Sequence, residues 1–306
     1  MTNKINGLIA APFTPMDNGG EVVFEKIPDY VRLLEKNKVV GAFVNGSTGE
    51  GVSLSQKEKM QITEAWVKAA SDKKELKIIN LIGGTSYKEC IENAKHSEEC
   101  GVDAIAMLAP YYFKPGTGGQ LAEFCAKVAV AVPAVPFYFY HIPVLSGCFV
   151  SMYDFLQEAS DMIPNLAGIK YTHEDFMDFL SCIHFADGKY DMLWGRDENL
   201  LSALVLGARG GVGSTFNYAA PLYYQLIDAF DRGDLEKARK LQQQSIGMIR
   251  LLGKYGGIAT GKAYMRYIGF ECGEFRLPVK NMSNEAYQKF EKDVQSLQIQ
   301  ELFSTL

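Results

Sequence analysis

The chain has 306 residues and a formal net charge of -5, and this acidic balance without a basic cluster argues against a nucleic-acid-binding surface. Its six cysteines are scattered without CxxC spacing, so neither a zinc site nor a disulfide framework is indicated. The polar start, Met1–Asn6, has no signal-peptide core and no later run is long enough to span a membrane, so we expect a soluble cytoplasmic protein with reduced thiols.

Apolar runs of strand length alternate with amphipathic runs of helix length along the chain. The predicted strands are Gly7–Phe13, Gly41–Val44, Lys77–Ile82, Ala104–Leu108, Pro136–Tyr140, Leu166–Tyr171, Asp191–Trp194 and Gly210–Ser214. The predicted helices between them include Phe24–Glu35, Lys88–Cys100 and Leu121–Val132. Ser55 and Glu58 have the spacing of a capping box, which predicts that a further helix begins there.

Strands that alternate with helices predict a parallel sheet, and eight such units predict a closed (β/α)8 barrel. A doubly wound sheet would need a glycine-rich dinucleotide fingerprint after the first strand, and Ala10–Phe13 has none. After Asp234 the pattern is helical only, over Leu235–Leu252, Ala259–Ile268 and Asn284–Leu297. We therefore expect residues 1–230 to form the barrel and residues 231–306 to form a helical extension packed on it.

A lysine lies near the end of one predicted strand. In this type of barrel the active site forms at the carboxyl ends of the strands, and Lys170 occupies that position in the run Leu166–Tyr171. Burial disfavours the ammonium form and lowers the pKa of a lysine, which yields the neutral amine that attacks ketones. Taken alone, the plainer interpretation is a lysine just past the strand in water, so the other strand ends must decide.

The second and fifth strand ends carry hydroxyl groups. The second strand is followed by a glycine-rich loop in which Ser47 and Thr48 offer hydroxyls and backbone N–H groups, suited to a carboxylate or a phosphate. A plain turn is the alternative interpretation of this loop. On the fifth strand, alternation places Tyr138 and Tyr140 on one face, and only Tyr140 reaches the rim.

The remaining strand ends add polar groups but no visible cluster of metal ligands. The seventh and eighth strands end at Gly195–Glu198 and Gly213–Thr215. His141 follows Tyr140 and either lines the pocket or serves as a structural histidine. The other histidines do not converge, so no metal site is expected; they are His96, His173 and His184. A lysine amine with a nearby phenol suits Schiff-base chemistry on a ketone, with the phenol moving protons.

Three ordered motifs resemble a known family, the pyruvate-dependent class I aldolases that include N-acetylneuraminate lyase and dihydrodipicolinate synthase. The motifs are Gly46–Glu50, Tyr140–Pro143 and Gly168–Lys170. The resemblance covers nearly the whole chain, from Gly7 to the segments Lys262–Ala263 and Arg276–Pro278.

The resemblance implies a role for each matching residue. Lys170 would form the imine with the pyruvate ketone, Ser47 and Thr48 would hold the pyruvate carboxylate, and Tyr140 would relay the proton. The residues implied to hold the sugar chain or to line the pocket are Thr172, Gly195, Asp197, Glu198 and Ser214. No cofactor is implied, because the imine supplies the electrophile. The family is commonly tetrameric, so a homotetramer is implied as well.

The run after Tyr140 indicates the branch. The synthase branch typically has an arginine there, in a Ser-Arg-Thr-Gly run, whereas Val144–Gly147 contains no cation and is similar to the lyase branch. Gly195–Glu198 also matches the Gly-x-Asp-Glu sugar motif of the lyases, although Pro110–Phe113 resembles a tyrosine-tyrosine segment of the synthases. The lyase branch implies cleavage of sialic acid (N-acetylneuraminate) to pyruvate and N-acetylmannosamine.

Three other functions remain open at this point. The first is a different aldolase of the same fold, acting on a 2-keto-3-deoxy acid or making dihydrodipicolinate. The second is a catalytically silent pyruvate- or sialate-binding protein, which the presence of both Lys170 and Tyr140 argues against. The third is a phosphate-binding barrel isomerase that uses Gly210–Ser214; it would need a carboxylate or histidine base at the mouth, where this sequence has Lys170 instead.

Overall fold

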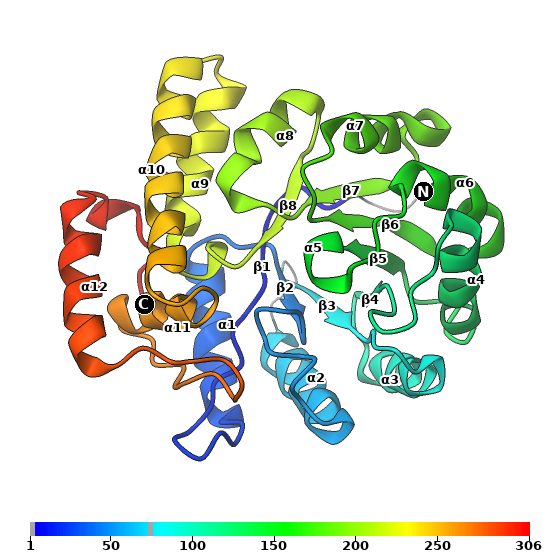
Figure 1. Ribbon diagram of the computed structural model, residues 1–306, viewed down its shortest axis with the longest axis horizontal. Coiled ribbons are helices and arrows are strands. Elements are labelled where there is room, and N and C mark those ends of the chain that lie inside the picture. The colour runs from blue at the N-terminus through cyan, green and yellow to red at the C-terminus, as the bar shows by residue number, and fades with distance from the viewer. Residues whose placement is uncertain (1–3, 73–75) are drawn as a thin grey trace.

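The computed structural model describes residues 4–72 and 76–306, so half of the polar start discussed above lies outside the described residues. Eight parallel strands close into a barrel in simple sequential order, with β8 paired to β1, and helices surround it (Figure 1). The predicted (β/α)8 barrel is confirmed. No helix formed by the described residues has the length and apolarity needed to cross a membrane.

The strands lie within two residues of their predicted bounds at each end, except the first. They are β1 (Gly7–Ala10), β2 (Gly41–Val44), β3 (Lys77–Leu81), β4 (Ala104–Leu108), β5 (Phe137–His141), β6 (Leu166–Tyr171), β7 (Asp191–Trp194) and β8 (Gly210–Gly213). The first strand was expected to reach Phe13, but it ends at Ala10. Pro12 lacks an N–H group, so the strand cannot continue its ladder of hydrogen bonds past it.

Twelve α-helices are formed by the described residues. They are α1 (Ile27–Lys36), α2 (Gln56–Ala70), α3 (Tyr87–Cys100), α4 (Gly118–Ala129), α5 (Pro143–Ser146), α6 (Met152–Met162), α7 (Phe176–His184), α8 (Leu200–Leu206), α9 (Phe216–Asp231), α10 (Leu235–Lys254), α11 (Ala259–Tyr267) and α12 (Asn284–Ser296). The capping box predicted at Ser55 is present, with Glu58 as its second member. Helix α4 begins three residues before the predicted start, because the Thr117 side chain caps it.

The side chains of the strands divide between two layers of core. One set fills the inside of the barrel and includes Phe43, Tyr138, Tyr140 and Val212. The other set packs outward against the helices and includes Ile169 and Tyr171. The predicted alternation on β5 is therefore confirmed. Tyr138 donates to Asp191 Oδ2 (2.9 Å) at the amino end of β7, while Tyr140 lies two residues nearer the carboxyl ends.

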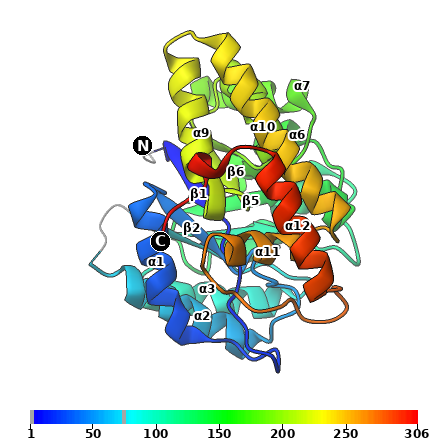
Figure 2. The ribbon, with the colours of Figure 1, turned by 90° about the vertical axis from the view of Figure 1, so that its left-hand side faces the viewer.

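Helices α10, α11 and α12 gather on one side of the barrel, next to α1 and α9 (Figures 1 and 2). They fall where the extension was expected, and α10 packs against α9. Glycine permits a close approach here, since a Cβ at Gly261 of α11 would overlap the Phe13 ring. The division of the chain at residue 230 stays a prediction; in the structure α9 continues to Asp231 before α10 begins.

Candidate active site

A cavity of about 240 Å³ opens at the carboxyl ends of the strands. All nine residues predicted for the site line it: Ser47, Thr48, Tyr140, Lys170, Thr172, Gly195, Asp197, Glu198 and Ser214. They come from the ends of β2, β5, β6, β7 and β8, which the closed barrel brings to one mouth. The role of each residue in catalysis or binding stays a prediction.

Lys170 lies near the end of β6 with its amine inside the barrel. The residue is only 4% exposed, and its Nζ lies 4.0 Å from the centroid of the Phe43 ring and 3.9 Å from that of Tyr140. Within the described residues Nζ has no hydrogen-bond or ion-pair partner. Burial lowers the pKa of Lys170 to about 7, while the charge of Asp197 opposes that shift. A substantial fraction of these amines is therefore neutral and nucleophilic near neutral pH.

Tyr140 is the register partner of Lys170 on the adjacent strand β5. Burial raises the pKa of the Tyr140 phenol to about 12, although the hydroxyls of Ser47 and Thr172 partly counteract this. The phenol is therefore protonated near neutral pH. Thr172 Oγ1 is buried and forms no well-aligned hydrogen bond with the described residues, so it can bond a ligand. The amine, the phenol and this hydroxyl face one small space.

The loop after β2 presents donors to the same cavity. Glu50 N–H donates to the Ser47 carbonyl (3.2 Å) and Gly51 N–H donates to the Gly46 carbonyl (3.0 Å), which holds the loop in a compact turn. The N–H groups of Ser47 and Thr48 donate no hydrogen bond to any described residue. Two free N–H groups and two hydroxyls form a cradle suited to a carboxylate.

Asp197 ties the loops after β7 and β8 together. Its Oδ2 accepts hydrogen bonds from the N–H (2.9 Å) and the hydroxyl (2.6 Å) of Thr215. Gly213 makes this approach possible, because a Cβ there would overlap the Asp197 carboxylate. Burial raises the pKa of Asp197 to about 6, and the Thr215 bonds oppose that shift. Gly195 has a similar requirement, since its Cβ would overlap the Thr172 hydroxyl.

Sequence reasoning missed a second cation on the cavity wall. Arg196 lines the cavity and pairs with Glu198 (2.7 Å) and with Glu174 (3.1 Å). Arg196 occupies the x position of the Gly-x-Asp-Glu motif at Gly195–Glu198. Its place between two matched residues was therefore the only indication in the sequence that it lies at the site. One terminal amino group of Arg196 is therefore paired with two carboxylates, while its buried Nε has no hydrogen-bond partner among the described residues.

The wall of the cavity also includes apolar residues that the sequence analysis did not propose. Leu145 comes from α5, and Ile249, Leu252 and Ile258 come from α10 and the turn that follows it. These three positions carried no sequence signal, because apolar residues on a helix are usually core. The helices after the barrel therefore help to close its mouth.

His141 points away from the cavity, which settles the alternative that the sequence left open. It is buried beside Tyr171 (ring centroids 5.0 Å apart) and His173 (5.6 Å) and does not line the cavity. Burial and the neighbouring His173 lower the pKa of His141 to about 4. Strand alternation explains this placement, since His141 directly follows Tyr140. His141 is therefore a structural histidine outside the cavity.

Comparisons with known proteins identify the family of the chain. The sequence profile of the dihydrodipicolinate synthetase family matches residues 4–297. The chain is 41% identical to human N-acetylneuraminate lyase over 298 residues, covering 96% of this chain and 93% of that protein. Among solved structures, an N-acetylneuraminate lyase of Proteus mirabilis superimposes with a TM-score of 0.93 at 37% identity, covering 96% of this chain and 99% of that one. A dihydrodipicolinate synthase of Bacillus anthracis gives 0.88 at 26% identity, covering 95% and 98%.

Proposed function

The chain belongs to the dihydrodipicolinate synthetase family, and within that family we propose that it is a carbon–carbon lyase acting on N-acetylneuraminate. Its products are pyruvate and N-acetylmannosamine, and the reaction is reversible. One observation carries the proposal: the buried Lys170 amine, unpaired within the described residues, lies 3.9 Å from the Tyr140 ring and opens on a cavity that also holds the free donors of Ser47 and Thr48.

The proposed reaction begins at Lys170. Its neutral amine attacks carbon 2 of the open-chain sugar acid, and loss of water gives an imine that becomes protonated. Meanwhile the substrate carboxylate accepts hydrogen bonds from the N–H groups and hydroxyls of Ser47 and Thr48. These fixed donors orient carbon 2 toward the amine, so binding also supplies the reacting geometry.

Cleavage then requires a proton to leave the carbon-4 hydroxyl. As it leaves, the bond between carbons 3 and 4 breaks and its electron pair moves into the iminium, which becomes an enamine. The pKa of about 12 means that Tyr140 carries its own proton, so it acts as a relay that accepts one proton while passing another on. Reprotonation of carbon 3 and hydrolysis of the imine release pyruvate and regenerate Lys170.

The lyase assignment over the synthase rests on the charges around the cavity. A synthase must hold two carboxylates, whereas Ser47 and Thr48 account for one. The run after Tyr140 is observed as α5, and it contributes Leu145 rather than a cation to the wall. Arg196 is engaged by Glu198 and Glu174, and Asp197 would repel a second anion. Carboxylates do accept hydrogen bonds from sugar hydroxyls, so Asp197, Glu198, Gly195, Ser214 and Thr172 are proposed to hold the sugar chain.

A coupled pyruvate assay tests the proposal against its rival. We expect the protein to release pyruvate from N-acetylneuraminate and to show little condensation of pyruvate with aspartate semialdehyde. Pyruvate plus borohydride should add mass to the peptide that carries Lys170, and Lys170→Ala should lose both the label and turnover. Faster use of the semialdehyde would favour the synthase, and pyruvate binding without turnover would favour a silent binding protein.

Oligomeric state and location are finer parts of the proposal. A homotetramer is supported by an exposed apolar patch made of Tyr112, Phe113, Val144, Leu145 and Phe149, each more than 60% exposed. Its two segments adjoin, because Cys148 Sγ lies 3.9 Å from the Pro115 carbonyl. A cytoplasmic location is supported by six free cysteines, as expected in a reducing compartment. Analytical ultracentrifugation and cell fractionation test the two points.

A further inference from the structure

The buried carboxylate of Glu50 has no part in the reaction proposed above. Glu50 follows the loop that carries Ser47 and Thr48, and its side chain is 3% exposed. Its own backbone closes that loop by donating to the Ser47 carbonyl. Its φ is 60°, a left-handed conformation that a non-glycine residue keeps only when its surroundings hold it there.

Both carboxylate oxygens of Glu50 are bound by the C-terminal part of the chain. Lys262 of α11 places its Nζ 2.9 Å from Glu50 Oε1, and the backbone N–H of Arg276 donates to Oε2 (2.8 Å). Lys262 Nζ also donates to the Glu274 carbonyl (2.8 Å). Lys262 and Glu50 are separated by 212 positions in the sequence, yet each is only 3% exposed.

The Arg276 side chain extends the same attachment. Its guanidinium pairs with Glu58 and donates to the carbonyls of Ser53 (3.2 Å) and Gly20 (2.8 Å). We call Lys262, Glu274 and Arg276 the C-terminal clamp. These residues bind the segment from Glu50 to Glu58, which follows Ser47 and Thr48 in the sequence after Gly49.

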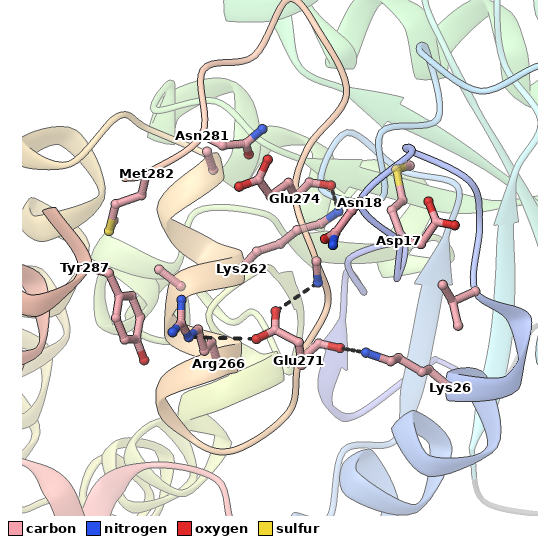
Figure 3. A pocket seen from close by; sticks show the side chains of 15 residues that line it. Asp17, Asn18, Lys26, Lys262, Arg266, Glu271, Glu274, Asn281, Met282 and Tyr287 are labelled. Carbon is pink, nitrogen blue, oxygen red and sulfur yellow. Dashed lines mark hydrogen bonds and ion pairs between the residues drawn. The ribbon is translucent and has the colours of Figure 1, made fainter. Parts of the chain in front are cut away.

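Lys262 also borders a second cavity, of about 470 Å³, that contains none of the nine predicted site residues. Figure 3 shows its side chain crossing from α11 toward the segment that carries Asn18, with Glu274 beside it. The walls of this cavity mix charges of both signs, including Lys26, Arg266 and Glu271. This mixture selects no ligand class, so the clamp rather than the cavity carries the inference.

A buried ion pair is a poor way to gain stability. Removing both charges from water offsets most of their attraction, and well-packed apolar residues of similar volume are often as stabilising. A buried pair does fix the distance and direction between its two charged groups, because separating them would leave an unpaired charge in the core. The Glu50–Lys262 pair sets where the loop stands relative to α11.

We propose that Lys262 and Glu50 are positioning residues that hold the Ser47–Thr48 donors in register with the substrate carboxylate. The pair touches no substrate and acts through the loop. Because Lys262 lies on α11, the helices after the barrel would take part in recognising the substrate carboxylate. The inference rests on the proposed function, in which Ser47 and Thr48 bind that carboxylate.

The test compares two ketones that form an imine with Lys170. Pyruvate carries a carboxylate and hydroxyacetone has a single hydroxyl in its place, so only pyruvate can use the full set of charge-assisted hydrogen bonds from the loop. Borohydride trapping at Lys170, measured by mass spectrometry against ketone concentration, gives the half-saturating concentration of each. In Lys262→Met we expect the half-saturating concentration of pyruvate to rise by roughly 10- to 100-fold. The reason is that a misplacement of binding groups by about 1 Å can cost on the order of 10²-fold. Trapping by hydroxyacetone should stay within about twofold of the parent.

A matched control makes the same chemical change elsewhere in the C-terminal helices. Lys254 of α10 pairs with Asp293 (2.6 Å), and its side chain is 58% exposed. Lys254→Met should trap both ketones as the parent does. Equal losses for the two ketones in Lys262→Met, or an unchanged requirement for pyruvate, would overturn the inference.

A second variant covers the case in which Lys262→Met does not fold. Glu50→Gln combined with Lys262→Met leaves no unpaired charge, and the glutamine can still accept from the Arg276 N–H. This double variant should fold and should also need more pyruvate for trapping, and a folded double variant with parental pyruvate trapping would refute the pair's role. Failure of the parent itself to be trapped at Lys170 would instead refute the proposed function.

Discussion

Replacing Tyr140 by phenylalanine tests the proton relay while leaving the surroundings of the amine in place. The Lys170 Nζ lies 3.9 Å from the centroid of the Tyr140 ring, and phenylalanine keeps that ring. Only the phenolic oxygen is lost, together with its interactions with the hydroxyls of Ser47 and Thr172. We therefore expect Tyr140→Phe to fold and to form the pyruvate imine at Lys170 normally.

The expected loss of turnover follows from the protonation state of the phenol. With a pKa of about 12, only about one phenol in 10⁵ is ionised at pH 7, so a preformed phenolate cannot be the main base. A relay by a positioned acid–base group contributes about 10²–10⁴-fold, or about 2.7–5.5 kcal/mol of transition-state stabilisation. Turnover of N-acetylneuraminate by Tyr140→Phe should fall by that factor.

Tyr138→Phe is the matched control for this prediction. Tyr138 lies on the same strand and the same face, but its hydroxyl donates to Asp191 at the opposite end of the barrel. Removing it leaves a buried carboxylate with one donor fewer, which should lower stability by about 1–3 kcal/mol without a comparable loss of turnover. Near-parental turnover in Tyr140→Phe would refute the relay. Parental turnover that rises tenfold per pH unit above neutrality, beyond the titration of Lys170, would instead indicate a phenolate base.

Three further predictions concern Lys170, the sugar end of the cavity and the clamp. The initial rate of pyruvate trapping should rise with pH through the Lys170 pKa of about 7 and then level off, because only the neutral amine attacks, while Lys170→Arg should not be trapped at all. Asp197→Ala or Glu198→Ala should weaken cleavage of N-acetylneuraminate at least tenfold, since each leaves a sugar hydroxyl without its acceptor, while pyruvate trapping persists. The bond from Arg276 lowers the pKa of Glu58 from 4.5 to about 2, so Glu58→Gln should be less stable than the parent at pH 7, and that difference should shrink as the pH falls from about 4.5 toward 2.

Each of these has a clear contrary outcome. A trapping rate that is flat between pH 6 and 8 would mean that the Lys170 amine is not the titrating nucleophile. Parental cleavage rates in both carboxylate variants would remove the sugar end of the cavity from the proposal. Thermal unfolding in which Glu58→Gln and the parent differ equally at pH 7 and at pH 3 would show that the Glu58 charge is not what stabilises the clamp.

Local pattern was sufficient for most of the fold. Strand-length apolar runs and helix-length amphipathic runs follow from the periods of the two structures, so their alternation predicted the closed barrel correctly. The same periodicity placed Tyr140 on the inner face of β5 and Lys170 near the end of β6. Because the carboxyl ends of parallel strands meet at one mouth, the residues that follow those ends had to gather there.

Contacts between distant parts of the chain were decided only by the tertiary structure. Arg196 lines the cavity but is engaged by Glu174 and Glu198, an arrangement that depends on how two loops meet. Ile258 reaches the mouth because the helices after the barrel fold back over it, and nothing in its local sequence distinguishes it from a core residue. Lys262 meets Glu50 across 212 positions for the same reason. Sequence periodicity specifies which face of an element a residue occupies, whereas the partner across that face depends on packing that involves the whole chain.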